Sequence, residues 1–205
     1  MYYLREEHQL SVFLGKKDVA DLNAYFTIPP NWDNGAKISH SWRTSIQRSI
    51  VGREKRSALF TRKRERVIYS TFLFFRSELV WLESIFFKYL HDRWGFPIWP
   101  DRATLNVAGA IGHSSIQVKG TANRHFKMDD ECILISEADC RIYEVHTISS
   151  VAATEIFLKS TLTKSWPVGS NVYPVIASRI PSTQVLTFET ADTVGFSVDA
   201  TETIE

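Results

Sequence analysis

The stretch from Trp42 to Asp101 constrains the fold most, because its hydrophobic pattern changes along the chain in a definite order. Between Trp42 and Gln47, apolar or β-branched side chains alternate with polar ones, which predicts a strand. Residues 67–75 alternate in the same way and are rich in the β-branched and aromatic side chains that strands favour. The two prolines beyond residue 95 disfavour helix and predict an extended segment up to Asp101.

An amphipathic helix is predicted after the second of these strands. Apolar side chains recur there at steps of three and four residues, so they share one helical face. They are Leu79, Leu82, Phe86 and Leu90. Ser77 is expected to cap this helix, with Glu78 in its first turn, and Gly95 is expected to end it. We expect Leu82 and Phe86 to pack on the sheet that contains the preceding strand.

The composition changes after Asp101, where short strands separated by turn residues follow one another. They are predicted at residues 115–119, 131–136, 141–148, 154–159 and 171–180. Five such strands favour a small closed barrel, similar to an OB-fold in strand count, because closure removes exposed sheet edges. Residues 184–190 and 193–201 predict a terminal hairpin. Two strands alone are marginal in water, so we expect this hairpin to join strands of residues 1–101.

The predicted fold class is therefore mainly β with one helix (α+β). A split β-sandwich domain carries the helix and comprises residues 1–102 and 183–205, and the OB-like barrel of residues 103–182 is inserted in it. Short strands are also expected at Leu10–Leu14 and Ala24–Ile28.

Composition limits the classes of protein that remain. The net charge of +1 excludes a generally cationic nucleic-acid binder, and two cysteines do not make a disulfide framework. No apolar run reaches the roughly 20 residues that span a membrane, and the first residues lack the order of a signal peptide. We therefore expect synthesis and assembly in a cytoplasm, without membrane insertion.

Catalytic and metal-binding patterns are not evident. Candidate metal ligands do not have the spacing of zinc sites, so no metal and no cofactor is expected. They are His113, His125, Cys132, Cys140 and His146. The cysteines are expected to be small core residues, and the histidines to lie in loops or at edges. Neither a Gly-x-Ser-x-Gly turn nor a phosphate-binding Gly-rich loop is found, so we do not expect an enzyme.

Residues 53–66 form a basic segment, expected to be a loop, with seven cations against Glu54 and Glu65. Three interpretations apply. The segment is a solvated loop, a site for nucleic-acid phosphates, or a subunit interface in which arginines meet acids of another protein. The segment contains no interleaved aromatic residues for base stacking, which counts against the second interpretation.

An ordered set of motifs over residues 26–101 resembles a known family. It begins with Pro29-Pro30-Asn31-Trp32, followed by Trp-x-Thr-Ser-Ile-x-x-Ser from Trp42 and Gly-x-Glu-x-Arg-x-Ala-Leu from Gly52. A short basic strand and a helix with Phe-Phe near its end come next. This order resembles the distal-tail or baseplate-hub-type tail proteins of long-tailed (siphovirus-like) phages. Many members carry Gln where Lys55 stands and Pro where Lys63 stands.

The resemblance implies a structural virion protein of the phage tail, assembled in the host cytoplasm. Such a protein forms a homo-oligomeric ring, a hexamer, that joins the tail tube protein to the baseplate hub protein. DNA passes through its lumen without specific binding, and the inserted barrel holds tail fibres or stabilises the ring. The resemblance favours the interface interpretation of the basic segment. The interface residues that we expect are Arg53, Arg56, Arg62 and Arg64, together with Trp32 and Trp42.

Other interpretations stay open at this stage. Trp32 is an interface anchor or, as large aromatic residues usually are, part of the core. The protein could also be a carbohydrate- or receptor-binding module of a tail, or a tail-completion protein. An exposed aromatic row would favour carbohydrate binding, whereas burial of the same residues would favour the ring. The row is Tyr143, Phe157, Trp166 and Tyr173.

Overall fold

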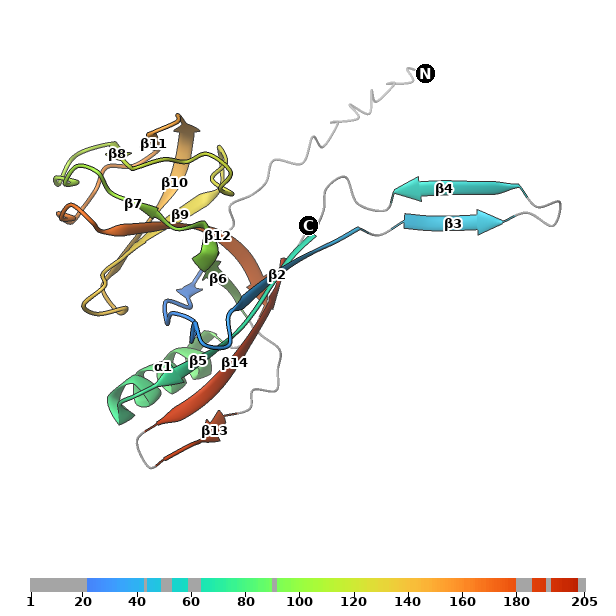
Figure 1. Ribbon diagram of the computed structural model, residues 1–205, viewed down its shortest axis with the longest axis horizontal. Helices are drawn as coiled ribbons and strands as arrows, with labels where there is room; N and C mark the ends of the chain where they lie inside the picture. Colours follow the sequence, from blue (N-terminus) through green and yellow to red (C-terminus); the bar gives the residue numbers. More distant parts are fainter. Residues whose placement is uncertain are drawn as a thin grey trace, which may run out of the picture.

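The computed structural model describes residues 22–42, 44–48, 53–58, 64–89, 92–179, 186–190 and 193–202. Over these residues the protein is mainly β with one helix, as the sequence predicted. It contains a mixed eight-stranded sheet, a four-stranded antiparallel sheet and a two-stranded ribbon (Figure 1). The strand expected at Leu10–Leu14 lies outside the described residues.

The four-stranded sheet contains the C-terminal hairpin. Its order is β13-β14-β5-β2. The bounds are β2 Ala36–Ser41, β5 Arg64–Leu73, β13 Leu186–Phe188 and β14 Val194–Thr201. All eight residues of β14 pair antiparallel with β5, from Val194 opposite Leu73 to Thr201 opposite Arg66. This pairing confirms that the hairpin joins the first hundred residues, as a two-stranded unit needs a sheet to be stable.

Helix α1 runs from Arg76 to Tyr89 and packs on this sheet. Leu82 is buried, and the ring of Phe86 lies 5.5 Å from that of Phe196 on β14, so the predicted helix-on-sheet packing is confirmed. The expected Ser77 cap is wrong, because the helix begins one residue earlier. The N–H of Phe74 instead donates to Glu78 Oε2 at 3.0 Å.

Gly95 does not end the helix; it lies in β6, Arg93–Pro97. This strand pairs antiparallel with β12, Asn171–Arg179, and parallel with the short β1, Ala24–Tyr25. A Cβ at Gly95 would collide with the ring of Tyr25 and lie 3.0 Å from Val175 Cγ1. The glycine is therefore needed for close packing and not for a helix stop.

The sequence predicted an extended chain up to Asp101, but the chain leaves the extended form soon after β6. Residues Trp99–Asp101 form a 3₁₀ turn, η1, with Pro100 at its start and Trp99 buried. Proline fits the first positions of a helical turn because its missing N–H has no partner to bond there.

The eight-stranded sheet runs in the order β1-β6-β12-β9-β10-β11-β8, and β7 also pairs with β12. The remaining bounds are β7 Ala103–Thr104, β8 Ser115–Gln117, β9 Glu131–Ile135, β10 Tyr143–Val151 and β11 Glu155–Leu158. A strand therefore forms in each of the five regions predicted beyond Asp101. The sheet crosses the expected domain division at residues 102 and 103, because β12 pairs with β6.

The closed OB-like barrel expected for residues 103–182 is not found among the described residues. The strand β7, which branches from β12, approaches β8, at one end of the strand path, through one isolated bridge from Leu105 to Val118. Two backbone hydrogen bonds support it: Lys119 N–H donates to Thr104 O, and Asn106 N–H to Gln117 O, both at 2.9 Å. No ladder of paired strands forms there, so the sheet stays open.

Two hydrophobic cores lie on opposite sides of β9 and β12. On β9, Ile133 and Ile135 enter a core shared with the four-stranded sheet and α1, whereas Cys132 and Leu134 enter a second core among β7–β12. Successive residues of a strand point to opposite faces, so β9 is buried on both sides. This explains its nearly continuous apolar sequence.

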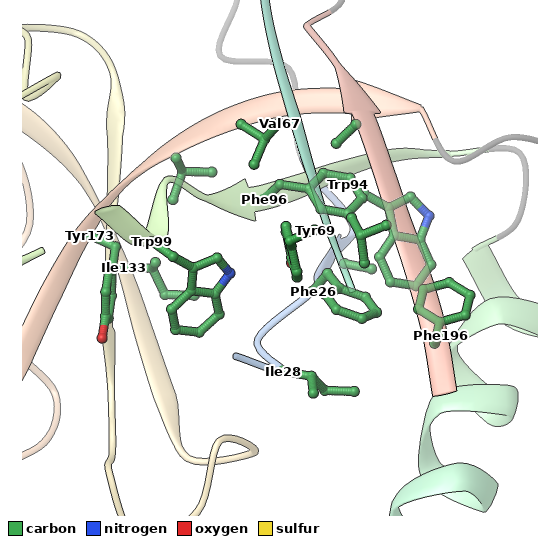
Figure 2. Close-up of a cluster of buried hydrophobic side chains, with 14 of the residues drawn as sticks. Phe26, Ile28, Val67, Tyr69, Trp94, Phe96, Trp99, Ile133, Tyr173 and Phe196 are labelled. Atoms are coloured by element: carbon green, nitrogen blue, oxygen red, sulfur yellow. The ribbon is translucent and has the colours of Figure 1, made fainter. Parts of the chain in front are cut away.

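Phe26 joins the parts of the first core (Figure 2). It follows β1, and its ring lies within 5.6–6.5 Å of four other aromatic rings. They belong to Tyr69 on β5, Phe86 on α1, Phe96 on β6 and Phe196 on β14. Aromatic residues bury large areas, so this single side chain contacts both sheets and the helix.

Replacing Leu82 with Ala should lower the free energy of unfolding by about 2–5 kcal/mol, because the side chain is buried and leaves a cavity. Val80→Ala, on the exposed side of the same helix, should change it by less than about 0.5 kcal/mol. Urea unfolding of both variants measures the difference. Equal losses would contradict the observed helix orientation.

Gly95→Ala should also destabilise the protein, by about 1–3 kcal/mol, because the new methyl group must displace Tyr25 or the strand. Gly120→Ala is the matched control, since the nearest atom to its Cβ is Arg124 Nη1 at 3.9 Å. Thermal unfolding of the two variants compares them. A Gly95→Ala protein as stable as the control would show that the packing at Tyr25 is loose.

Candidate functional site

The described part of the basic segment lies mostly in strands, in β4 and at the start of β5, so the predicted loop is wrong for these residues. Residues Glu54–Ala58 form β4, which pairs antiparallel with β3, Thr44–Arg48. Together with Trp42 and Arg53 we call this ribbon the arm. It projects away from both larger sheets (Figure 1), and neither hydrophobic core contains one of its residues. The arm is therefore a surface element that does not help to form the cores.

The two faces of the arm differ in chemistry. Residues paired across an antiparallel ribbon point to the same side. Ile46 lies opposite Arg56 and Arg48 opposite Glu54, so these four side chains share one face. The other face pairs Gln47 with Lys55 and is wholly polar. One face thus combines the exposed Ile46 with Arg48 and Arg56, and we call it the docking face.

The predicted interface arginines do not form one group. Arg56 forms a salt bridge with Glu54 of its own strand, and Arg48 Nε lies 3.5 Å from the same carboxylate. Arg53 directly precedes β4 and is exposed. Arg64 is half-buried at the start of β5, opposite Ser41, and Arg62 lies outside the described residues.

Both predicted tryptophans are exposed, Trp32 by 59% and Trp42 by 69%. The core interpretation of Trp32 is therefore wrong. Trp32 sits in a turn whose neighbour Asn31 donates its N–H to Ser70 O on β5 at 2.7 Å. This bond holds the turn against the sheet while the indole points outward, so both tryptophans are available for contact with another molecule.

The aromatic row considered for carbohydrate binding is mostly buried. Trp166 and Tyr173 are in the cores, and Tyr143 is half-buried, so Phe157 at 37% exposure is the most accessible of the four. A sugar platform needs adjacent exposed rings, and these residues do not supply one.

A second exposed surface was not predicted. Phe74, Phe75 and Val80 are exposed at the junction of β5 and α1, and Phe188 is exposed at the end of β13. The register brings them to one end of the four-stranded sheet, because Phe188 lies opposite Val194, which lies opposite Leu73. We call this end the tip. Alternation over residues 67–75 suggested a longer strand and gave no sign that the last two phenylalanines are exposed.

A buried polar cluster lies around Glu144 on β10. Its Oε2 accepts a hydrogen bond from Trp166 Nε1 at 2.8 Å, and the N–H of Thr163 donates to Oε1. His146 is on the same face, with Nδ1 2.7 Å from Ser160 Oγ and Nε2 3.0 Å from Glu144 Oε1. The expectation that His146 is a loop or edge residue is therefore wrong.

This cluster has the residue types of a catalytic triad but not its geometry. His146 Nε2 makes no hydrogen bond to the Glu144 carboxylate. A triad base needs such a bond to hold its imidazole in position. The bonds to Trp166 and Thr163 instead tie the 163–166 segment to β10. We therefore assign the cluster to structure.

His125 links the two parts of the fold. Its backbone N–H donates to Asp101 Oδ2 at 3.0 Å, its Nδ1 contacts the same carboxylate, and its Nε2 lies 3.5 Å from Glu65 Oε1 on β5. In the part of the chain that the structure describes, no group of three or more His, Cys, Asp or Glu residues could hold a metal ion. Burial raises the pKa of the Cys132 thiol to about 12, which suits a core residue and not a nucleophile.

No helix among the described residues is both long and apolar enough to cross a membrane. In comparisons with known proteins, no family model matches the sequence, and no curated protein matches it.

The Glu144 cluster should make the free energy of unfolding depend on pH in the acid range. Burial raises the pKa of Glu144, but the hydrogen bonds from Trp166 and Thr163 and the nearby His146 outweigh it, so the pKa lies below its ordinary value. Stability from this group is present above the unfolded-state pKa of about 4.3 and is lost as pH falls through the lower folded-state value. Glu144→Gln should cost about 1–3 kcal/mol at pH 7 and flatten this acid dependence.

Urea unfolding between pH 7 and pH 3 measures both effects, with Glu155→Gln on the neighbouring strand as the control. An unchanged acid slope in the Glu144 variant would show that its carboxylate is not held by these bonds.

Proposed function

We propose that this protein is a structural virion subunit of the distal-tail type, at the tail tip of a long-tailed phage. Its copies form a ring, a hexamer by resemblance, between the tail tube protein and the baseplate hub protein. The four-stranded sheet and α1 belong to the ring domain, and the strands of residues 103–182 form the inserted unit that faces fibres or neighbouring proteins. The protein has no catalytic role in this proposal.

The observation that carries the proposal is the arm. An isolated two-stranded ribbon is marginal in water, and an exposed ribbon with Trp42, Ile46 and several arginines gains stability by contact with another surface. Arginine and tryptophan are enriched in protein interfaces. A projecting element that contacts a different surface on the next copy makes a heterologous contact, and such contacts close into rings.

The charges of the arm favour a protein partner over DNA. The described arm has four cations, Arg48, Arg53, Lys55 and Arg56, against the single acid Glu54. Six such arms around one axis repel one another unless acidic surface lies close to them. Strong phosphate contacts in a lumen would retain DNA, whereas a tail must release it. The arm is therefore assigned to contacts between proteins, and DNA passes the lumen without specific binding.

The runner-up function, carbohydrate or receptor binding, has weaker support. It needs an exposed aromatic row on the strands beyond Asp101, and Trp166 and Tyr173 are buried. The tail-completion alternative also uses a structural subunit and is separated from the present proposal by the position of the protein in the tail.

The arm can be removed without cutting into the sheet, which gives a direct test. Ser41 and Arg64 pair directly, so an Asn-Gly turn can replace residues 42–63 and close β2 onto β5 as a hairpin. We expect this armless protein to keep its free energy of unfolding within about 1 kcal/mol, because neither core contains any of the described residues that are removed. Its production in place of the intact protein should abolish complete tails in electron micrographs.

The control is the intact chain produced at the same level. Complete tails assembled with the armless protein would contradict the proposal, and an unfolded armless protein would contradict the assignment of the arm to assembly.

A further inference from the structure

We propose that the arm of one copy docks on the tip of a second copy of this chain. This inference rests on the proposed function and identifies the surface that receives the arm. It concerns two exposed features with apolar side chains, the docking face of the arm and the tip.

The arm and the tip lie at opposite ends of strand β5. β5 starts at Arg64, beside the base of the arm, and ends at Leu73, directly before the tip residues Phe74 and Phe75. Ten residues of strand span about 33 Å. Figure 1 shows the arm and the start of α1 at opposite ends of the sheet. The arm of one copy cannot reach the tip of the same copy over the length of β5, so the contact joins two copies.

Both surfaces combine apolar side chains with charge, and the charges are opposite. Around the tip, Glu78 lies in the first turn of α1, Glu83 lies further along the helix, and Glu189 directly follows Phe188, against the cation Arg76 at the start of the helix. Glu189 and Phe72 both lie over Gly195, since a Cβ there would be 3.8 Å from Glu189 Oε1 and 3.4 Å from Phe72 Cε1. The ring of Phe72 lies 6.3 Å from that of Phe74, so this acid is close to one phenylalanine of the tip. The arm has four cations against one acid, so the two surfaces attract.

Other charged groups near the tip do not cancel its sign. Arg141, in the turn before β10, is close enough to Glu78 to be affected by its charge. Arg141 is paired with Asp139 through an Nε to Oδ1 contact of 2.8 Å, so the pair adds no net charge. The tip therefore keeps an excess of acid beside Phe74, Phe75, Val80 and Phe188.

The chemistry of contact follows from the docking face. Ile46 supplies apolar area for the phenylalanines, and the exposed Trp42 precedes the same strand in the chain. Arg48 and Arg56 each contact Glu54 through Nε, and their remaining guanidinium N–H groups supply donors for carboxylates at the rim. The contact uses different patches on the two copies and repeats from copy to copy, which is the requirement for a ring.

The first test places a photoreactive phenylalanine analogue at residue 46 of the purified full-length chain. After illumination, mass spectrometry should find cross-links between copies at residues 72–83 or 186–190. The same analogue at residue 47, on the opposite face of β3, is the control and should give at least fivefold fewer.

The second test uses charge reversal. Arg56→Glu and Glu83→Arg should each weaken self-association about tenfold in analytical ultracentrifugation, and the double variant should recover most of the loss. Lys55→Glu, on the polar face of the arm, should change it less than twofold.

The outcomes separate this inference from the proposed function. Cross-links from residue 46 to another surface of the second copy, with rings still formed, would overturn the docking site and leave the ring. A protein that stays monomeric and gives no cross-links between copies would overturn both. Weakened association in the double variant, equal to the sum of the single losses, would show that the two charges act on different partners.

Discussion

The packing around Phe26 is the interaction on which the rest of the structure depends. Its ring contacts aromatic rings from β5, α1, β6 and β14, so it holds both larger sheets and the helix in one core. Close packing of this kind explains why Gly95 is needed on β6, where a Cβ would collide with Tyr25. The sheet positions that result fix the base of the arm at one end of β5 and the tip at the other.

The local elements could be predicted from the sequence because they depend on periodicity. The helix over Leu79–Phe86 and the strands beyond Asp101 follow from steps of three to four and of two residues. Long-range pairing was accessible in one case, the C-terminal hairpin, because two strands alone are unstable. The sequence predicted that Gly95 ends the helix. The glycine is instead needed for close contact with Tyr25, seventy residues away in the chain.

The sequence predicted the charged residues of the candidate site but not its secondary structure. The cations of residues 53–66 are visible in the sequence, whereas the pairing of β3 with β4 depends on register. The tip could not be predicted, because exposed phenylalanines at the end of a strand have the same local pattern as buried ones. His146 was misjudged for a related reason: a polar residue on the inward face of β10 has hydrogen-bond partners that come from residues 160–166.

The central claim is that the arm is an assembly element that finds its partner on another copy. Cryo-electron microscopy of the purified intact chain, at concentrations where it associates, tests this claim most directly. If the arm contacts a second copy, the particles are closed rings in which the arm of each copy is ordered against its neighbour. Rings with every arm projecting free into solvent, or particles that remain single subunits at all concentrations, would contradict it.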